Sequence, residues 1–218
     1  MDIKAFLFDL DGVLVDTARY HYLAWKALAD RLQIPFTVQD NERLKGVSRR
    51  ASLEILLSLG REFYSEEDRL QFMVDKNKLY LSYIARLTQE DLLPGALSFL
   101  HTCRQYGLGI GLGSASKNAP LILERLGISE LFDVIIDGRD TQRTKPDPEV
   151  FLLGSQALGT HPEFCAVFED SVAGIEAAKR AGMLPIGITS TGLEGAVIQY
   201  PGLKNCDLTT LLVEIAAL

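Results

Sequence analysis

Two aspartates separated by a single residue follow an apolar segment near the start of the chain. Asp9 and Asp11 come directly after the apolar run 3–8, and Gly12 follows where the chain must turn. Carboxylates crowded at the end of a buried strand repel each other and are costly to desolvate. A divalent cation would relieve this repulsion, and Mg²⁺ prefers one or two carboxylates together with phosphate oxygens. A carboxylate placed there can also attack phosphorus and form an aspartyl phosphate. The alternative is a solvated, aspartate-rich turn.

More polar side chains follow apolar segments further along the chain. Ser114 and the pair Glu169 and Asp170 each come directly after an apolar run. In an open parallel sheet the carboxyl ends of the strands meet at one edge, so these side chains can converge with the first two aspartates. Four acids at one edge would repel one another strongly without a cation. The sequence therefore predicts a Mg²⁺ site held by Asp9 and Asp170, with Glu169 as a direct or an indirect ligand.

The apolar spacing changes along the chain and divides it into two regions. Helical spacing predicts helices at 17–33, 48–59 and 66–86, and no convincing strand lies between 16 and 87. Beyond residue 94, strands and helices alternate. The predicted strands lie at 108–113, 132–136, 165–168 and 184–188, and the predicted helices at 96–105, 118–126, 148–158, 172–181 and from 208 onward.

This alternation implies right-handed crossovers and a parallel sheet, to which the first strand also belongs. The helical block is then an insertion. We therefore expect an α/β fold, a three-layer, Rossmann-like core with a parallel sheet and an inserted all-helical cap. The core would comprise residues 1–15 and 92–218 and the cap residues 16–91, joined by linkers near 13–16 and 88–94.

Composition narrows the classes of partner. The formal net charge of −7 in 218 residues argues against a nucleic-acid or acidic-membrane partner. Three widely spaced cysteines indicate neither a disulfide framework nor a zinc site. The chain enters a strand almost at once, without a signal peptide, and no apolar run approaches the length of a membrane span. The glycines of segment 107–113 repeat every second residue, which does not match a dinucleotide-binding pattern. We expect a cytoplasmic monomer.

The motif order Asp-x-Asp, Ser, Lys and Glu-Asp resembles that of the haloacid dehalogenase-type phosphotransferases over nearly the whole chain. Within that family, segments 17–25, 44–52 and 113–118 are most similar to the beta-phosphoglucomutase subgroup, which isomerises β-D-glucose 1-phosphate to glucose 6-phosphate. The resemblance implies that Asp9 accepts the phosphoryl group and that the backbone carbonyl of Asp11 joins the Mg²⁺ ligands. For a mutase it also implies glucose 1,6-bisphosphate as intermediate and activator.

Phosphoryl transfer needs an in-line nucleophile with positive charge around the phosphoryl oxygens. Asp11 lies past the nucleophile, near the turn, where it can reach a substrate hydroxyl as general acid and base. Lys145 would supply positive charge, and Ser114 with its neighbouring backbone amides would supply donors. Taken alone, Lys145 is typical of a solvated lysine and Ser114 of an N-cap. The predicted catalytic residues are Asp9, Asp11, Ser114 and Lys145, and the predicted metal ligands are Asp9, Asp11, Glu169 and Asp170.

The helical block offers groups for a sugar and a second phosphate. Thr17, His21 and Trp25 are four apart and share a helix face, where Trp25 could stack on a sugar; the alternative is a structural stripe. Segment 45–49 places two cations around a glycine before a helix start, which suits an anion, although an ordinary capped helix has the same pattern. The predicted substrate-contacting residues are Thr17, His21, Trp25, Lys45, Gly46, Val47, Ser48, Arg49, Ser52, Lys76, Ala115, Ser116, Lys117 and Asn118.

Three functions of different classes fit these residues. A phosphomutase would return the phosphoryl group to a sugar hydroxyl, whereas a Mg²⁺-dependent phosphatase of the same family would pass it to water. Asp16 is equally typical of such phosphatases, so the first motif does not separate the two, and the cap segments favour the mutase. The third is a non-catalytic phosphoacceptor module. Asp11 and the large insertion argue against it, because a switch needs no second acid beside the acceptor.

Overall fold

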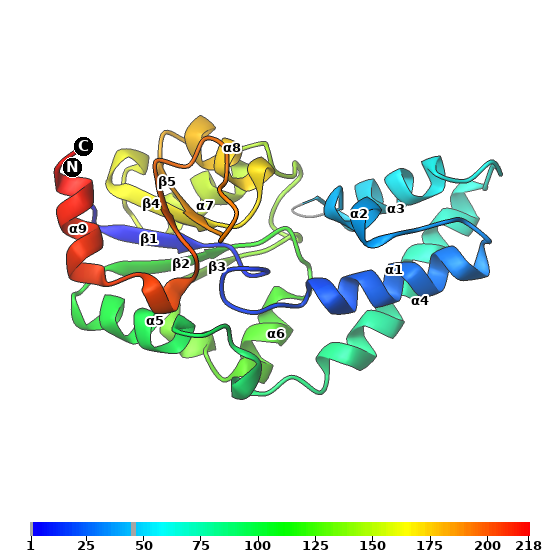
Figure 1. Ribbon diagram of the computed structural model, residues 1–218, viewed down its shortest axis with the longest axis horizontal. Helices are drawn as coiled ribbons and strands as arrows, with labels where there is room; N and C mark the ends of the chain where they lie inside the picture. The colour runs from blue at the N-terminus through cyan, green and yellow to red at the C-terminus, as the bar shows by residue number, and fades with distance from the viewer. Residues whose placement is uncertain (1, 45–46) are drawn as a thin grey trace.

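The computed structural model describes residues 2–44 and 47–218. Within these residues the core is a six-stranded sheet in which every neighbouring pair of strands is parallel, in the order β3-β2-β1-β4-β5-β6 (Figure 1). The strands are β1 (Ala5–Phe8), β2 (Gly109–Gly113), β3 (Val134–Ile136), β4 (Cys165–Glu169), β5 (Leu184–Ile188) and β6 (Ile198–Tyr200). The predicted fold class is confirmed.

Strand β6 is absent from the sequence-based prediction. It is three residues long, and none of the three is fully buried, so it has no apolar pattern to detect. It is held at the sheet edge by backbone hydrogen bonds to β5 and its flanks, including those from Val197 N to Pro185 O (3.0 Å) and from Thr189 N to Tyr200 O (2.8 Å). Main-chain pairing rather than side-chain burial therefore creates this strand.

Helices cover both faces of the sheet and make three layers (Figure 1). One face carries α5 (Ala96–Gln105), α6 (Ala119–Leu126) and α9 (Leu208–Ala216), and the other carries α7 (Glu149–Ala157) and α8 (Val172–Arg180). Short 3₁₀ turns lie at Gln89–Asp91, Ser129–Leu131, Pro162–Phe164 and Leu203–Asn205. The sheet is thus buried on both sides, which explains why its strands are nearly continuous apolar runs.

The central strand β1 serves both layers because successive side chains point to opposite faces. Phe6 and Phe8 belong to one apolar cluster, and Leu7 belongs to the other. Phe168 of β4 stacks on Phe8 with ring centroids 4.7 Å apart and meets Phe6 edge-on at 5.0 Å. This aromatic packing lies directly beneath the ends of β1 and β4 and fixes where those ends lie.

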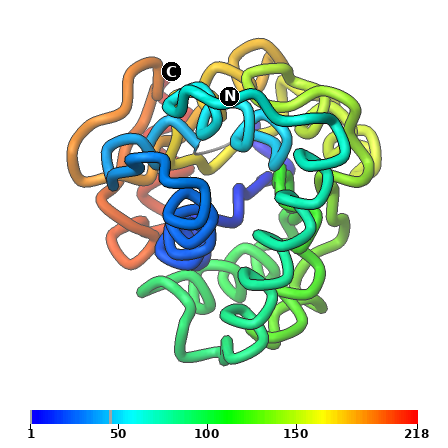
Figure 2. Tube along the Cα trace, turned by 90° about the vertical axis from the view of Figure 1, so that its right-hand side faces the viewer, coloured from blue at the N-terminus to red at the C-terminus, as the bar shows by residue number. Residues whose placement is uncertain are grey.

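The inserted helices have a core of their own. They are α1 (Ala18–Arg31), α2 (Val38–Glu42), α3 (Arg49–Ser58) and α4 (Glu66–Ile84). Trp25, Leu53 and Leu56 are among the buried residues of this separate cluster. The three predicted helices are present, whereas α2, a five-residue helix, is not predicted. Figure 2 shows the insertion in front of the sheet layers.

The chain enters and leaves the helical insertion at one place. Val15 pairs with Leu92 in an antiparallel bridge, and Leu93 N donates to Leu14 O at 2.9 Å. The two connecting segments therefore lie side by side next to the end of β1. The predicted boundaries, 1–15 with 92–218 and 16–91, stay a prediction, as does the use of these segments as hinges.

Phe168→Ala is expected to lower the free energy of unfolding by about 3–5 kcal/mol, because it removes a fully buried ring that packs against three others. Phe63 is 99 % exposed, so Phe63→Ala is a control with the same chemical change and should alter it by about 0.5 kcal/mol or less. Urea denaturation measures both. Equal losses at the two positions would contradict the described packing.

Candidate active site

A cavity of about 560 Å³ lies between the carboxyl edge of the sheet and the cap. The predicted residues that line it from the core are Asp9, Asp11, Ser114, Ala115, Ser116, Lys117, Asn118 and Asp170. Those that line it from the cap are His21, Trp25, Val47, Ser48, Arg49, Ser52 and Lys76. Thr17, Lys145 and Glu169 are buried and do not line it, and Lys45 and Gly46 lie outside the described residues.

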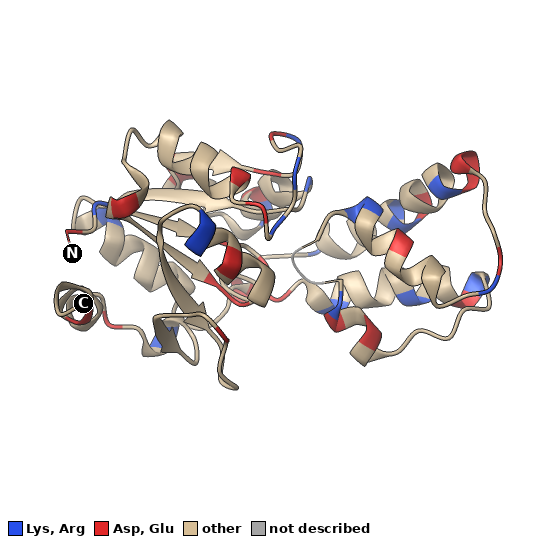
Figure 3. Cartoon of the chain, turned by 90° about the horizontal axis from the view of Figure 1, so that it is seen from above, with Lys and Arg blue, Asp and Glu red and all other residues tan. Residues whose placement is uncertain are grey.

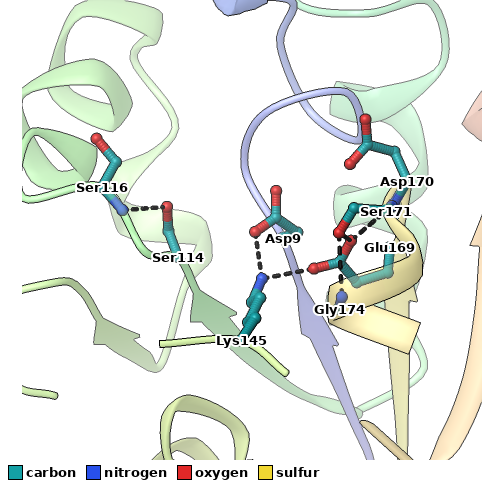
Figure 4. Close-up of polar contacts among 8 residues, drawn as sticks. All are labelled: Asp9, Ser114, Ser116, Lys145, Glu169, Asp170, Ser171 and Gly174. Carbon is teal, nitrogen blue, oxygen red and sulfur yellow. Dashed lines mark hydrogen bonds and ion pairs between the residues drawn. The ribbon is translucent and has the colours of Figure 1, made fainter. Parts of the chain in front are cut away.

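A buried lysine joins two acids at the base of this cavity (Figure 4). Lys145 Nζ lies 2.5 Å from Asp9 Oδ1 and 2.6 Å from Glu169 Oε1. Burial alone would lower the pKa of Lys145, but attraction to Asp9 and Glu169 outweighs it, so the pKa is raised above the ordinary lysine value. Lys145 is therefore a permanent positive charge that holds Asp9 in place.

Glu169 is predicted as a direct or indirect metal ligand, and the geometry favours an indirect role. Its Oε1 accepts from Lys145, while its Oε2 accepts from the amides of Asp170 and Ser171 and from the Ser171 hydroxyl, each at 2.9 Å. Both oxygens are engaged with protein donors. Glu169 thus anchors Lys145 and the start of α8 instead of facing the cavity.

Helix α8 can start here because of one glycine. A Cβ added to Gly174 would lie 1.8 Å from Glu169 Oε1, so no other residue fits without moving that carboxylate. The Gly174 amide instead donates to the hydroxyl of Ser171, which caps the helix at 3.1 Å. The turn between β4 and α8 is in this way fitted around the Glu169 carboxylate.

The carboxylates in front of Lys145 fit a magnesium ion. Burial raises the pKa of Asp9 well above its ordinary value; Lys145 opposes this, and Glu169, Asp170 and Asp11 add to it. A Cβ on Gly12, which has a φ of +84°, would lie 2.1 Å from Asp170 Oδ2, so Asp170 packs against the peptide that follows Asp11.

These observations place the side chains of Asp9 and Asp170 and the peptide between Asp11 and Gly12 at one edge of the sheet. They are oxygen donors of the kind that Mg²⁺ prefers, and their mutual repulsion would be relieved by it. Within residues 2–44 and 47–218, no group of three or more His, Cys, Asp or Glu side chains is arranged as a complete metal site. Mg²⁺ would therefore be held by few side chains, with the backbone and the substrate supplying other oxygens.

The second aspartate is held by the cap. Thr17 Oγ1 donates to Asp11 Oδ1 and accepts from the hydroxyl of Tyr80 at 3.1 Å. Burial raises the pKa of Asp11, although the Thr17 hydrogen bond opposes the shift. Thr17, which is predicted to contact substrate, is fully buried and contacts Asp11 instead. Its neighbour on the helix face, His21, does reach the cavity.

The cap wall carries buried positive charge. Lys76 is 2 % exposed, lies 2.8 Å from His21 Nδ1, and sits over the ring of Trp25 at 4.7 Å. Burial and the nearby Arg49 lower the pKa of Lys76 to about 7, and burial, Lys76 and Arg49 lower the pKa of His21 well below its usual value. Among the described residues no carboxylate forms an ion pair with Lys76 or Arg49.

This arrangement opposes charges across the cavity. Figure 3 shows residues of both signs on the cap helices and in the core loops that face the cap, but at the cavity itself Asp9, Asp11 and Asp170 lie on the core side and Arg49 and Lys76 on the cap side. Trp25 is 2 % exposed and has Lys76 over its ring, so little of the indole is left for the sugar stacking that the sequence suggests. The cap wall therefore suits an anionic group more than a flat sugar face.

The segment after β2 is ordered by successive hydrogen bonds within it. Ser114 Oγ accepts from Ser116 N at 3.1 Å (Figure 4). Ser116 Oγ accepts from Asn118 N at 3.3 Å. The Asn118 amide reaches across to the cap and donates to Asn77 Oδ1 at 3.0 Å. Helix α6 begins directly afterwards at Ala119, so its N-terminus faces the same space.

Sequence reasoning missed several residues at this cavity. Apolar side chains of α4, including Leu70 and Val74, line its mouth, and so do Thr141 and Gln142 of the loop after β3. Asn41 of the unpredicted helix α2 lines the cap wall. The helical spacing of Leu70 and Val74 is visible in the sequence, but it does not distinguish a face that lines a cavity from one that packs in a core.

Comparisons with known proteins match this geometry. Residues 3–182 match the family model described as haloacid dehalogenase-like hydrolase. The chain belongs to the haloacid dehalogenase-like hydrolase family. A beta-phosphoglucomutase of Bacillus subtilis (strain 168) is 46% identical over 188 residues, which cover 85% of this chain and 83% of the relative. The family resemblance predicted from the motif order is confirmed.

The similar proteins include ones named for each of the two predicted activities. A phosphorylated carbohydrates phosphatase of Thermotoga maritima is 33% identical, with 98% of this chain and 100% of the relative covered. A solved beta-phosphoglucomutase from Clostridium difficile superposes with a TM-score of 0.95 at 39% identity, covering 99% of this chain and 98% of that one. No helix in the described part of this family member is long and apolar enough to cross a membrane.

Lys76→Met is expected to stabilise the free protein most below pH 7. The folded-state pKa of Lys76, about 7, lies below the ordinary value of 10.5, so the unfolded wild type binds more protons between these values and its stability rises with pH there. The increase in the free energy of unfolding of the variant over wild type, at most about 5 kcal/mol, should vanish towards pH 10.5.

The measurement is chemical denaturation of both proteins from pH 6 to pH 10. Lys78→Met, on the exposed side of the same helix, is the matched control and should alter the free energy of unfolding by about 0.5 kcal/mol or less. A pH-independent effect of Lys76→Met would contradict the buried ammonium.

Proposed function

We propose that this chain is a phosphomutase that interconverts β-D-glucose 1-phosphate and glucose 6-phosphate through an aspartyl phosphate on Asp9 and a bisphosphate intermediate. The observation that carries the proposal is the pair of cap cations, Arg49 and Lys76, which face the acidic core edge with no described carboxylate paired to them. A monophosphate needs one phosphate site, whereas a bisphosphate needs a second across the cavity. The similarity to beta-phosphoglucomutases supports the same function.

Asp9 is the proposed nucleophile. Its carboxylate oxygen attacks the phosphorus, the bond from phosphorus to the sugar oxygen breaks, and the leaving oxygen takes a proton from Asp11. Lys145 holds Asp9 through Oδ1 at 2.5 Å and carries a fixed positive charge towards the phosphoryl oxygens. When bound, Mg²⁺ neutralises further charge on those oxygens. Ser114 accepts from the Ser116 amide, which leaves its hydroxyl proton to donate to the phosphoryl group.

The return step uses the same residues in reverse. Asp11 takes the proton of the other sugar hydroxyl, whose oxygen then attacks the phosphorus of the aspartyl phosphate and releases the Asp9 carboxylate. The raised pKa of Asp11 suits this exchange, because a general acid and base works best when its pKa approaches the working pH. The hydrogen bond from Thr17 couples the orientation of Asp11 to the cap.

The cap is proposed to act as a lid. An aspartyl phosphate hydrolyses if water reaches it, so a mutase must exclude water during transfer and open again for the bisphosphate to turn round. The adjacent connections at Val15 and Leu92 suit such a movement. Leu70 and Val74, about half exposed at the mouth of the cavity, would be covered on closure.

The second candidate is a sugar-phosphate phosphatase. It is favoured by the whole-length similarity to the Thermotoga maritima phosphatase, and the chemistry at Asp9 would be common to both activities. Activation by glucose 1,6-bisphosphate belongs to the mutase alone. Mg²⁺ dependence and a monomeric, cytoplasmic enzyme without nucleic-acid or membrane partners are proposed for either.

Asp9→Asn should abolish transfer to sugar and to water while preserving the fold, because the amide is a far weaker nucleophile. Mass spectrometry of wild-type protein incubated with a phosphoryl donor, or trapped with a fluoride mimic, should place the group on Asp9. Removal of Mg²⁺ with EDTA should eliminate activity of the wild type. Circular dichroism supplies the check on folding. A phosphoryl group mapped to another residue would contradict the role of Asp9.

Arg49→Ala should reduce mutase turnover by about ten- to a hundredfold, the effect of losing one charge-assisted contact, and should spare slow hydrolysis of a small phosphate ester. Arg49→Lys should recover only part of the loss, because lysine lacks the bidentate fork. The assay supplies β-glucose 1-phosphate, Mg²⁺ and a trace of glucose 1,6-bisphosphate, coupled to glucose 6-phosphate dehydrogenase.

Arg31→Ala is the matched control, since Arg31 pairs with Asp75 on the cap and does not line the cavity. It should leave turnover unchanged. Rapid phosphate release without glucose 6-phosphate would overturn the mutase proposal and favour the phosphatase.

A further inference from the structure

The cap wall of the cavity contains a buried amide oxygen without a hydrogen-bond partner among the described residues. Asn41, near the end of α2, lines the cavity and is 6 % exposed. Its Oδ1 is the buried side-chain atom that has no hydrogen-bond partner in the described part of the chain. A buried amide oxygen left unpaired is destabilising, and native proteins pair the great majority of such groups. The Oδ1 atom of Asn41 is therefore a hydrogen-bond acceptor to which no described residue donates.

The surroundings of Asn41 indicate which ligand would use it. It shares the cap wall with Trp25, Leu44 and the buried hydroxyl of Ser52. An apolar and aromatic wall interrupted by a few polar groups is typical of a pocket that orients a small polar molecule. Lys76 lies over the ring of Trp25, so this uncharged part of the cap wall adjoins the cationic part.

The charged groups of the cavity limit where each part of the ligand can lie. Asp9 and Asp170 with their predicted metal lie on the core side, and Arg49 and Lys76 lie on the cap side. These groups would take the phosphates, which leaves the uncharged amide of Asn41 for an uncharged part of the ligand. In a sugar bisphosphate that part carries the ring hydroxyls. A hydroxyl both donates and accepts, and so does an amide.

We propose that Asn41 binds a ring hydroxyl of the sugar phosphate and so contributes to the choice of sugar. The identity of the ligand class rests on the proposed function. The χ2 torsion of asparagine has a broad distribution of allowed angles. The amide can therefore rotate, so that its buried Oδ1 atom turns towards a ligand while α2 stays in place. The cost of burying an unpaired amide in the free protein would then be recovered on binding.

The test compares Asn41→Leu with wild type on β-glucose 1-phosphate and on its 2-, 3- and 4-deoxy analogues. For the full sugar, kcat/KM should fall about tenfold, as for one lost hydrogen bond. For the analogue that lacks the partner hydroxyl, the two proteins should differ less than twofold. Hydrolysis of acetyl phosphate, which has no sugar, should be unchanged. An equal loss on all four sugars would overturn the proposal.

A stability measurement separates binding from a structural role. Because the variant replaces an unpaired polar group with an apolar one of similar size, the melting temperature of the free protein should stay the same or rise. A clear drop in melting temperature of soluble Asn41→Leu would mean that the amide supports the fold, and would overturn the proposal. If Asn41→Leu does not fold, Asn41→Ala repeats the sugar comparison. Asn205→Leu, at an exposed site, is the matched control.

The outcome for the proposed function can be read independently. If wild type releases phosphate instead of forming glucose 6-phosphate, the mutase proposal fails, and the same four sugars compared by phosphate release still test Asn41. If wild type forms glucose 6-phosphate and Asn41→Leu matches it on every sugar, only the proposal for Asn41 fails.

Discussion

A single buried ammonium holds the catalytic edge of this protein together. Lys145 bridges Asp9 at the end of β1 and Glu169 at the end of β4. Taking these charges out of water is expensive, and removing any one of them would leave another uncompensated in the interior. Because Glu169 also binds the first amides before α8, the position of the nucleophile and the start of a helix depend on the same charge.

The cap presents the opposite electrostatic character. Its wall carries Lys76 and Arg49, which form no ion pair with a described carboxylate. Attraction to Asp11 offsets only part of the cost of burying Lys76, so these cations destabilise the free protein at low pH. Core and cap therefore each keep an unfavourable concentration of one charge, and a ligand with two anionic ends and a bound cation would offset both. The electrostatic repulsion in the empty cavity lowers the stability of the free protein and is relieved when the substrate binds. The cavity therefore favours ligand binding at the expense of maximal stability.

The sequence could predict the core of the site because the ends of parallel strands converge whatever the side chains are. Asp9 and Ser114 are placed in that way. The sequence could not show that Glu169 faces inwards, because this depends on backbone amides that exist only after the turn has folded. Nor could the sequence show that Thr17 contacts Asp11. A stripe of residues on one helix face can line a cavity or pack against other side chains of the protein, and the spacing is the same in both cases. Asn41 lies in a helix too short for periodic spacing, so nothing in the pattern marked it.

The bridge between Val15 and Leu92 has an evolutionary consequence. Because the insertion leaves and rejoins the core at adjacent points, its replacement by a domain of another size would not require any strand of the sheet to change its partner. The core, which carries the phosphoryl chemistry, can thus evolve separately from the cap, which recognises the molecule that carries the phosphate. A lineage could keep the first unchanged and acquire new substrates by exchanging or remodelling the second, one module at a time.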